Sequence, residues 1–384
     1  MKGRRSNRLL LLASVVSGCL TCQQLPRGRV IEHVVCGGNE KQSYALYLPA
    51  AYSQAHAWPI LYCLDPGARG RVPVERFSSA AEQRGFIVAG SNNSRNGSNA
   101  VAEEAIEWLV RDTHERFSLD DSRVYTAGFS GGARLSLAWA ANGRIAGVIA
   151  CGAGFSADII PKEVPFRIFA TAGIDDFNYD EVFGMSRELS RRGVSQRFAD
   201  FAGGHEWLPE SIATEALDFM TGRLTAAPPP PESREQKKAA QLYVRFTEEV
   251  ERGDDFTRRS ILRRMQRDSK LAEDGLDRRV ARRVLTGTFI AAMEQGRRLL
   301  DEKKYVDAAR AWDLAALARP DNAQAWYALA MSRAGAHDKR GALDALQQAI
   351  ANGFRDRDRL EGEPLFELLR KEPKFIGLTA ALAK

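Results

Sequence analysis

Residues 128–132, with the sequence Gly-Phe-Ser-Gly-Gly, constrain the fold of this chain more than any other feature. They follow a β-branched and aromatic run at 123–127 that predicts a buried strand, and they precede an apolar pattern at 133–140 that predicts a helix. A strand that turns directly into a helix holds the central serine in a strained backbone conformation, which small neighbours at 128 and 132 permit. The pattern predicts an α/β fold that exposes the hydroxyl of Ser130 at the edge of a sheet.

The first part of the chain repeats this alternation of strand and helix. Eight apolar runs predict strands, and after the third run they alternate with helical patterns. The runs are 29–35, 43–48, 59–64, 86–90, 123–127, 146–151, 166–172 and 195–201. We therefore expect a mostly parallel sheet flanked by helices, with the long polar loop 90–98 at the edge where substrate pockets form.

A serine hydroxyl becomes a nucleophile when a base takes its proton and a carboxylate orients that base. In a sheet of this kind the three groups follow in the order Ser, Asp or Glu, His. Of the five histidines, three precede Ser130 and His337 lies in a separate helical region, which leaves His205 as the candidate base. The carboxylate is expected after the run at 166–172, where Asp175 and Asp176 are adjacent candidates.

The serine turn, the aspartates after 166–172 and the Gly-Gly-His-x-Trp sequence at 203–207 together resemble the α/β-hydrolase superfamily. Within it, the chain is most similar to compact secreted esterases related to polyhydroxybutyrate depolymerases, feruloyl esterases and dienelactone hydrolases. The resemblance covers roughly residues 29–222. It implies a serine esterase with Ser130 as nucleophile and His205 as base, and its Gly-x-x-Asp spacing selects Asp176 as the acid. No cofactor is implied.

A hydrolase of this kind also needs donors for the oxyanion of its tetrahedral intermediate. The N–H of Gly131, at the start of the predicted helix, is the first expected donor. Related enzymes place His-Gly after the third strand, whereas this chain has Asp-Pro-Gly-Ala at 65–68. Pro66 has no N–H. Gly67 or Ala68 is therefore expected to supply the second donor, unless this segment is only a turn.

The N-terminus predicts a leader rather than part of the fold. Residues 1–18 combine a basic start with a short apolar run at 9–16, which is too short to span a membrane and is typical of a signal peptide. The sequence Val-Ser-Gly-Cys at 16–19 resembles a bacterial lipobox. We expect lipid on Cys19, a tether at 19–28 and a location in the bacterial cell envelope. An ordinary secretory signal is the alternative.

A run of four prolines at 228–231 marks the end of the first domain. It predicts a stiff linker at 225–232 between an α/β-hydrolase domain at 29–224 and a helical domain at 233–384. Because few contacts need to cross such a spacer, the two halves are expected to be separable.

The helical half contains an internal repeat of 34 residues, which pairs Ala308 with Ala342 and Trp312 with Leu346. This spacing of small and large residues resembles the tetratricopeptide pattern, with copies at about 289–322 and 323–356. An ordinary helical bundle is the alternative. Such repeats usually bind a peptide or protein partner, but a spacer is equally compatible with the sequence.

The net charge of +6 is concentrated in 232–300, where arginines occur in pairs such as 278–279 and 282–283. At helical spacing these pairs predict solvated basic faces, and contact with anionic lipid headgroups is the alternative. The charge is not a nucleic-acid signature. No Cys/His cluster has the spacing of a metal site.

The expected function is a membrane-tethered serine hydrolase that acts on a small or extended ester. A different class of function is a lipoprotein scaffold that binds a partner through its helical repeats and has a weakly active hydrolase domain. A serine peptidase is a further alternative.

Overall fold

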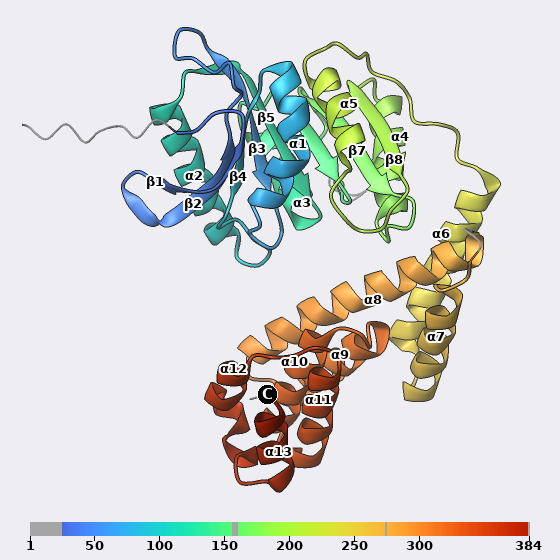
Figure 1. The fold of residues 1–384 in the computed structure, drawn as a ribbon. Helices are drawn as coiled ribbons and strands as arrows, with labels where there is room; N and C mark the ends of the chain where they lie inside the picture. Colours follow the sequence, from blue (N-terminus) through green and yellow to red (C-terminus); the bar gives the residue numbers. More distant parts are fainter. Residues whose placement is uncertain (1–24, 156–159, 273–274, 383–384) are drawn as a thin grey trace, which may run out of the picture.

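The computed structural model of the chain describes residues 25–155, 160–272 and 275–382, and it is built around one eight-stranded sheet (Figure 1). The order of the strands is β1-β2-β4-β3-β5-β6-β7-β8. β2 pairs antiparallel with β1 and β4, and the other neighbours are parallel. The strands are Val30–Cys36 (β1), Asn39–Tyr47 (β2), Trp58–Leu64 (β3), Ile87–Ser91 (β4), Leu119–Phe129 (β5), Gly147–Cys151 (β6), Arg167–Gly173 (β7) and Gln196–Phe201 (β8). All eight predicted strands are confirmed.

Helices cover both faces of this sheet. They are Arg71–Arg84 (α1), Asn99–Arg116 (α2), Gly131–Asn142 (α3), Tyr179–Arg191 (α4) and Glu210–Met220 (α5). One apolar core packs α2, α3 and α4 on one face, and a second core packs α1 and α5 on the other. Every residue of the central strand β3 is consequently buried, as expected for a strand covered on both sides. The architecture is the α/β-hydrolase fold.

Beyond the prolines, the described part of the chain is helical. Its helices are Arg234–Arg252 (α6), Asp255–Asp268 (α7), Leu276–Asp301 (α8), Tyr305–Ala318 (α9), Ala323–Gly335 (α10), Lys339–Ala351 (α11), Arg357–Gly362 (α12), the 3₁₀ helix Pro364–Leu369 and Pro373–Ala381 (α13). α6 begins with a capping box, in which the side chains of Ser233 and Gln236 each bond the other's backbone N–H. The prediction of an α/β domain followed by an all-α domain is confirmed.

The 34-residue repeat corresponds to consecutive antiparallel helix pairs. α9 and α11 begin at Tyr305 and Lys339, and they pack against α8 and α10 respectively. A Cβ placed on Gly296 would lie 2.6 Å from Nε1 of Trp312, so α8 and α9 cross where only glycine fits. The paired repeat positions are buried, among them Ala308, Trp312, Ala342 and Leu346. Assignment to the tetratricopeptide class stays a prediction.

One prediction for the helical half is wrong. The side chain of Arg283 is only 1% exposed, because it points from α8 into the α/β domain rather than into solvent. Arg282 on the same helix is partly exposed and pairs with Asp175 of the α/β domain. The arginine pairs therefore do not all form solvated faces.

The predicted signal peptide and Cys19 lie outside the described residues, as does most of the tether. Within the ranges that the structure describes, no helix combines the length and apolar character needed to cross a membrane.

Candidate active site

Ser130 occupies the sharp turn between β5 and α3. Its backbone has φ 53° and ψ −121°, a left-handed conformation that is strained for a residue with a side chain. The flanking glycines make this turn possible. A Cβ on Gly128 would lie 2.1 Å from the carbonyl oxygen of Gly132, and a Cβ on Gly132 would lie 2.0 Å from that of Leu64. The strained strand-to-helix turn inferred from the sequence is thus present.

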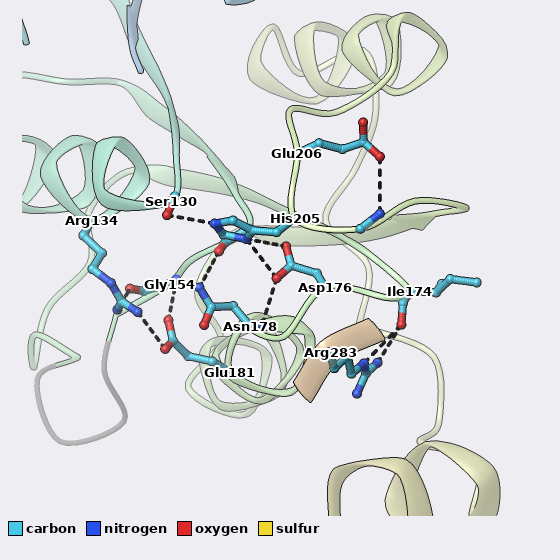
Figure 2. A network of polar contacts seen from close by, with 12 residues as sticks. Ser130, Arg134, Gly154, Ile174, Asp176, Asn178, Glu181, His205, Glu206 and Arg283 are labelled. Atoms are coloured by element: carbon cyan, nitrogen blue, oxygen red, sulfur yellow. Dashed lines mark hydrogen bonds and ion pairs between the residues drawn. The ribbon is translucent and has the colours of Figure 1, made fainter. Parts of the chain in front are cut away.

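Ser130, His205 and Asp176 form a continuous chain of hydrogen bonds (Figure 2). Nε2 of His205 lies 2.9 Å from Oγ of Ser130, and its Nδ1 lies 3.0 Å from each carboxylate oxygen of Asp176. Asp176 is fully buried and the His205 side chain is 5% exposed. A neutral imidazole with its proton on Nδ1 satisfies this geometry, since it donates to the carboxylate and accepts from the serine hydroxyl.

The loop after β7 fixes the carboxylate of Asp176. The backbone N–H of Asn178 donates to Oδ1 of Asp176 at 2.8 Å, and the Asn178 amide donates to the carbonyl oxygen of Gly152 at 2.8 Å. Gly152 has φ 62°, and a Cβ there would lie 2.9 Å from Oδ2 of Asp176. Asp175 points elsewhere, with Oδ2 2.6 Å from Nη1 of Arg282. His205 therefore contacts Asp176 and not Asp175.

Two aromatic rings pack against the imidazole of His205. The ring centroids of Phe129 and Phe177 lie 4.6 Å and 4.5 Å from that of His205. Phe129 immediately precedes Ser130 in the sequence, and Phe177 immediately follows Asp176. The residues next to the serine and the aspartate therefore also pack against His205. These contacts restrict the ring to the orientation in which both of its nitrogens are bonded.

Trp207 anchors the loop that carries His205. Its indole Nε1 donates to Oδ2 of the fully buried Asp65 at 2.8 Å, and Trp207 itself is 4% exposed. Asp65 follows β3, so this bond ties the histidine loop to the loop after the third strand. The sequence singled out the tryptophan within Gly-Gly-His-x-Trp but gave no signal for its partner.

The loop after β3 does not offer the expected oxyanion donor. The N–H of Gly67 donates to Oδ1 of Asp65 at 2.8 Å, and that of Ala68 donates to the Asp65 carbonyl oxygen at 3.2 Å. The Arg69 guanidinium also pairs with Asp65, at 2.9 Å. Because Asp65 folds this segment into a turn around its own carboxylate, the expectation for Gly67 and Ala68 is not met.

The N–H of Gly131 differs from those of Gly67 and Ala68 in its hydrogen bonding. Gly131 begins α3, and no acceptor for its N–H occurs among the described residues. The carboxamide of Asn96 lies directly against Gly131, because a Cβ on that glycine would be 1.9 Å from Oδ1 and 3.0 Å from Nδ2 of Asn96. Nδ2 of Asn96 also donates to Oε1 of Glu294 on α8, at 3.1 Å. The sequence indicated a pocket loop at 90–98, but no local feature distinguished Asn96 from the other polar residues of that loop.

A second polar cluster joins α3, α4 and the segment after β6. Arg134 of α3 donates to the carbonyl oxygen of Gly154 at 3.0 Å and to Glu181 of α4 at 2.8 Å, and Glu181 accepts the Gly154 N–H at 2.8 Å (Figure 2). These bonds fix the segment after β6, which also contains Gly152. In the ranges with described coordinates, no group of three His, Cys, Asp or Glu side chains could hold a metal ion.

Comparisons with known proteins yield structural neighbours only. No protein-family model matches the chain, and no curated protein matches it. An S-formylglutathione hydrolase from Staphylococcus aureus is 16% identical, with a TM-score of 0.40, and the match covers 51% of this chain and 98% of that one. A ferulic acid esterase is 17% identical, with a TM-score of 0.42 and the same two coverages. An esterase from the archaeon Pyrobaculum calidifontis is 13% identical, with a TM-score of 0.40, and the match covers 52% and 88%.

Proposed function

We propose that this protein is a serine hydrolase that cleaves carboxylic esters, with Ser130 as nucleophile, His205 as general base and Asp176 as the orienting carboxylate. One observation carries the proposal: the hydrogen-bonded chain from Oγ of Ser130 through His205 to Asp176, with Ser130 in a strained turn. The strain places the hydroxyl in reach of a substrate and of the base at the same time.

The geometry supports a two-step mechanism. Oγ of Ser130 attacks the ester carbonyl carbon while Nε2 of His205 takes the hydroxyl proton. The tetrahedral intermediate then collapses to an acyl-serine, and His205 returns the proton to the departing alcohol oxygen. Water attacks the acyl-serine in the same manner, with His205 again as the base, and releases the acid and the free serine. Asp176 stabilises the imidazolium in both steps.

Two groups are proposed to stabilise the oxyanion. The N–H of Gly131 has no acceptor among the described residues and begins helix α3, whose dipole favours negative charge at that end. The second is Nδ2 of Asn96, because its carboxamide lies against Gly131 and an amide nitrogen has two hydrogens, only one of which is needed for Glu294. A side-chain amide can serve in this role in place of a backbone N–H.

The remaining parts of the proposal concern the setting of the reaction. Lipid on Cys19 would tether the protein in the bacterial cell envelope. The helix pairs α8–α9 and α10–α11 are proposed to be tetratricopeptide-like repeats, which commonly bind a protein partner. The substrate is proposed to be a small or extended ester.

Covalent labelling with a fluorophosphonate tests the proposal, because this probe reacts only with an activated serine. The wild-type protein should be labelled and should hydrolyse a p-nitrophenyl ester, and Ser130→Ala should do neither. Ser98→Ala is a matched control, since Ser98 lies at the exposed start of α2 and makes no capping bond. Labelling that persists in Ser130→Ala would refute the nucleophile. A folded wild-type protein without labelling would favour the scaffold, and cleavage of peptides but not esters would favour a peptidase.

A further inference from the structure

Helix α8 of the helical domain reaches the loop that carries the proposed triad acid. It lies between the hydrolase domain and the remaining repeat helices (Figure 1). Arg283, in the first half of α8, is the largest fully buried side chain among the described residues. A buried arginine contributed by a second domain needs a specific reason, because removing its charge from water is unfavourable unless its donors are satisfied.

The loop after β7 supplies the partners of Arg283. Nη2 of Arg283 donates to the carbonyl oxygen of Ile174 at 2.8 Å, and Nε donates to the same oxygen at 3.3 Å. Nη1 donates to Oδ2 of Asp180 at 3.0 Å, and the guanidinium lies over the ring of Tyr179, 4.9 Å from its centroid. Arg283 thus bonds to the chain on both sides of Asp176, as Figure 2 shows for Ile174.

Two further contacts join α8 to the same loop. Nη1 of Arg282 lies 2.6 Å from Oδ2 of Asp175, the residue directly before Asp176. A Cβ on Gly287 would lie 3.3 Å from Cβ of Phe177, the residue directly after it. The ring of Phe177 packs on the imidazole of His205, so α8 is joined to both the acid and the base through residues next to them. Ile174 and Asp175 therefore bond to side chains of this helix, and Phe177 lies next to its Gly287.

In this charged pair the Arg283 side chain is 1% exposed and the Asp180 side chain is 30% exposed. Burial lowers the pKa of Arg283 and raises the pKa of Asp180, and each partner's charge opposes the effect of burial on the other. Arg283 remains paired with groups of fixed position, since the Ile174 carbonyl belongs to the backbone that leads into Asp176. A planar guanidinium bonded in this way specifies orientation, which an apolar side chain of similar size would not do.

We propose that Arg283 is a positioning residue for the triad, through which the helical domain holds the Asp176 loop in its reactive geometry. The inference rests on the proposed serine hydrolase function. In this role of Arg283, the helical domain is a part of the active site rather than only a binding module or spacer.

The test uses the full-length chain and steady-state hydrolysis of an aryl ester. Arg283→Met removes the donors and keeps an unbranched apolar side chain. We expect kcat to fall on the order of 10²-fold with little change in KM, because a small displacement of a reacting group costs about that much. Arg259→Met is the matched control: Arg259 bridges Asp255 and Asp313 within the helical domain. This control should leave kcat unchanged.

A double substitution separates positioning from general stability. If Arg283 acts through Asp176, Arg283→Met should cost little further activity in a protein that already contains Asp176→Asn. An equal loss in both backgrounds, or a folded Arg283→Met protein with wild-type kcat, would overturn the inference. If Arg283→Met does not fold, Arg283→Lys replaces it in the same comparison. Failure of the proposed function itself is recognised separately, by fluorophosphonate labelling that survives Ser130→Ala.

Discussion

Replacement of Asp176 by asparagine tests the acid of the proposed triad. Both carboxylate oxygens lie 3.0 Å from Nδ1 of His205, and Oδ1 also accepts the N–H of Asn178 at 2.8 Å. Asparagine keeps the shape of the side chain, but its NH₂ group favours the imidazole tautomer in which Nε2 carries the proton. That nitrogen then cannot accept the proton of Ser130. In serine proteases the same change lowers kcat by about 10⁴-fold, equivalent to about 5.4 kcal/mol of transition-state stabilisation.

The neighbouring Asp175→Asn substitution is the control. The Asp175 side chain is buried, at 7% exposed, and its carboxylate faces Arg282 rather than His205, so asparagine keeps its shape without altering a group bonded to the base. We expect a loss of less than about tenfold in kcat by the same transition-state relation. The measurement is kcat on an aryl ester, with the rate of fluorophosphonate labelling as an independent readout and circular dichroism as the check of folding. A larger loss for Asp175→Asn than for Asp176→Asn would show that the assigned acid is wrong by one residue.

Three further substitutions test other parts of the proposal. Asn96→Ala should lower kcat on the order of 10²-fold without changing KM, as expected for a lost oxyanion donor, and an unchanged kcat would exclude that role. Trp207→Phe removes the buried bond to Asp65 and should lower the free energy of unfolding by about 1–3 kcal/mol in chemical denaturation; a stability equal to wild type would show that this bond does not anchor the loop. Cys19→Ser should shift the protein from the membrane to the soluble fraction, or block its processing, and membrane association that persists in the processed protein would refute the lipid tether.

Local sequence predicted the helices and strands of the α/β domain well, because these elements are determined by short-range rules. The strand-to-helix turn needs glycine at 128 and 132, where the structure leaves no room for a Cβ. The runs that form central strands such as β3 and β6 are continuously apolar because helices cover both faces of the sheet, which buries every residue of these strands. The order Ser, Asp, His then selected three side chains that the structure brings into contact.

Long-range contacts explain what the sequence did not predict. The loop after β3 was expected to offer a free N–H, but the side chain of Asp65 accepts from that loop and from Trp207, which lies more than a hundred residues later. Arg283 was expected in solvent because charged residues at helical spacing usually are. Its burial depends on where α8 lies relative to the loop after β7, which no local pattern specifies.

The contact between the two halves bears on whether the hydrolase domain can act alone. Each half has its own apolar cores, and the described contacts between them are made largely by the ends of long polar side chains, including those of Arg282, Arg283 and Glu294. A fragment of residues 23–224 should therefore fold, since it retains both cores of the sheet. It would nevertheless lose the bonds that hold the Asp176 loop, so we expect kcat on a small ester to fall as it does in Arg283→Met. A folded fragment with the full-length kcat would show that α8 only borders the site, and that the linker separates two independent modules.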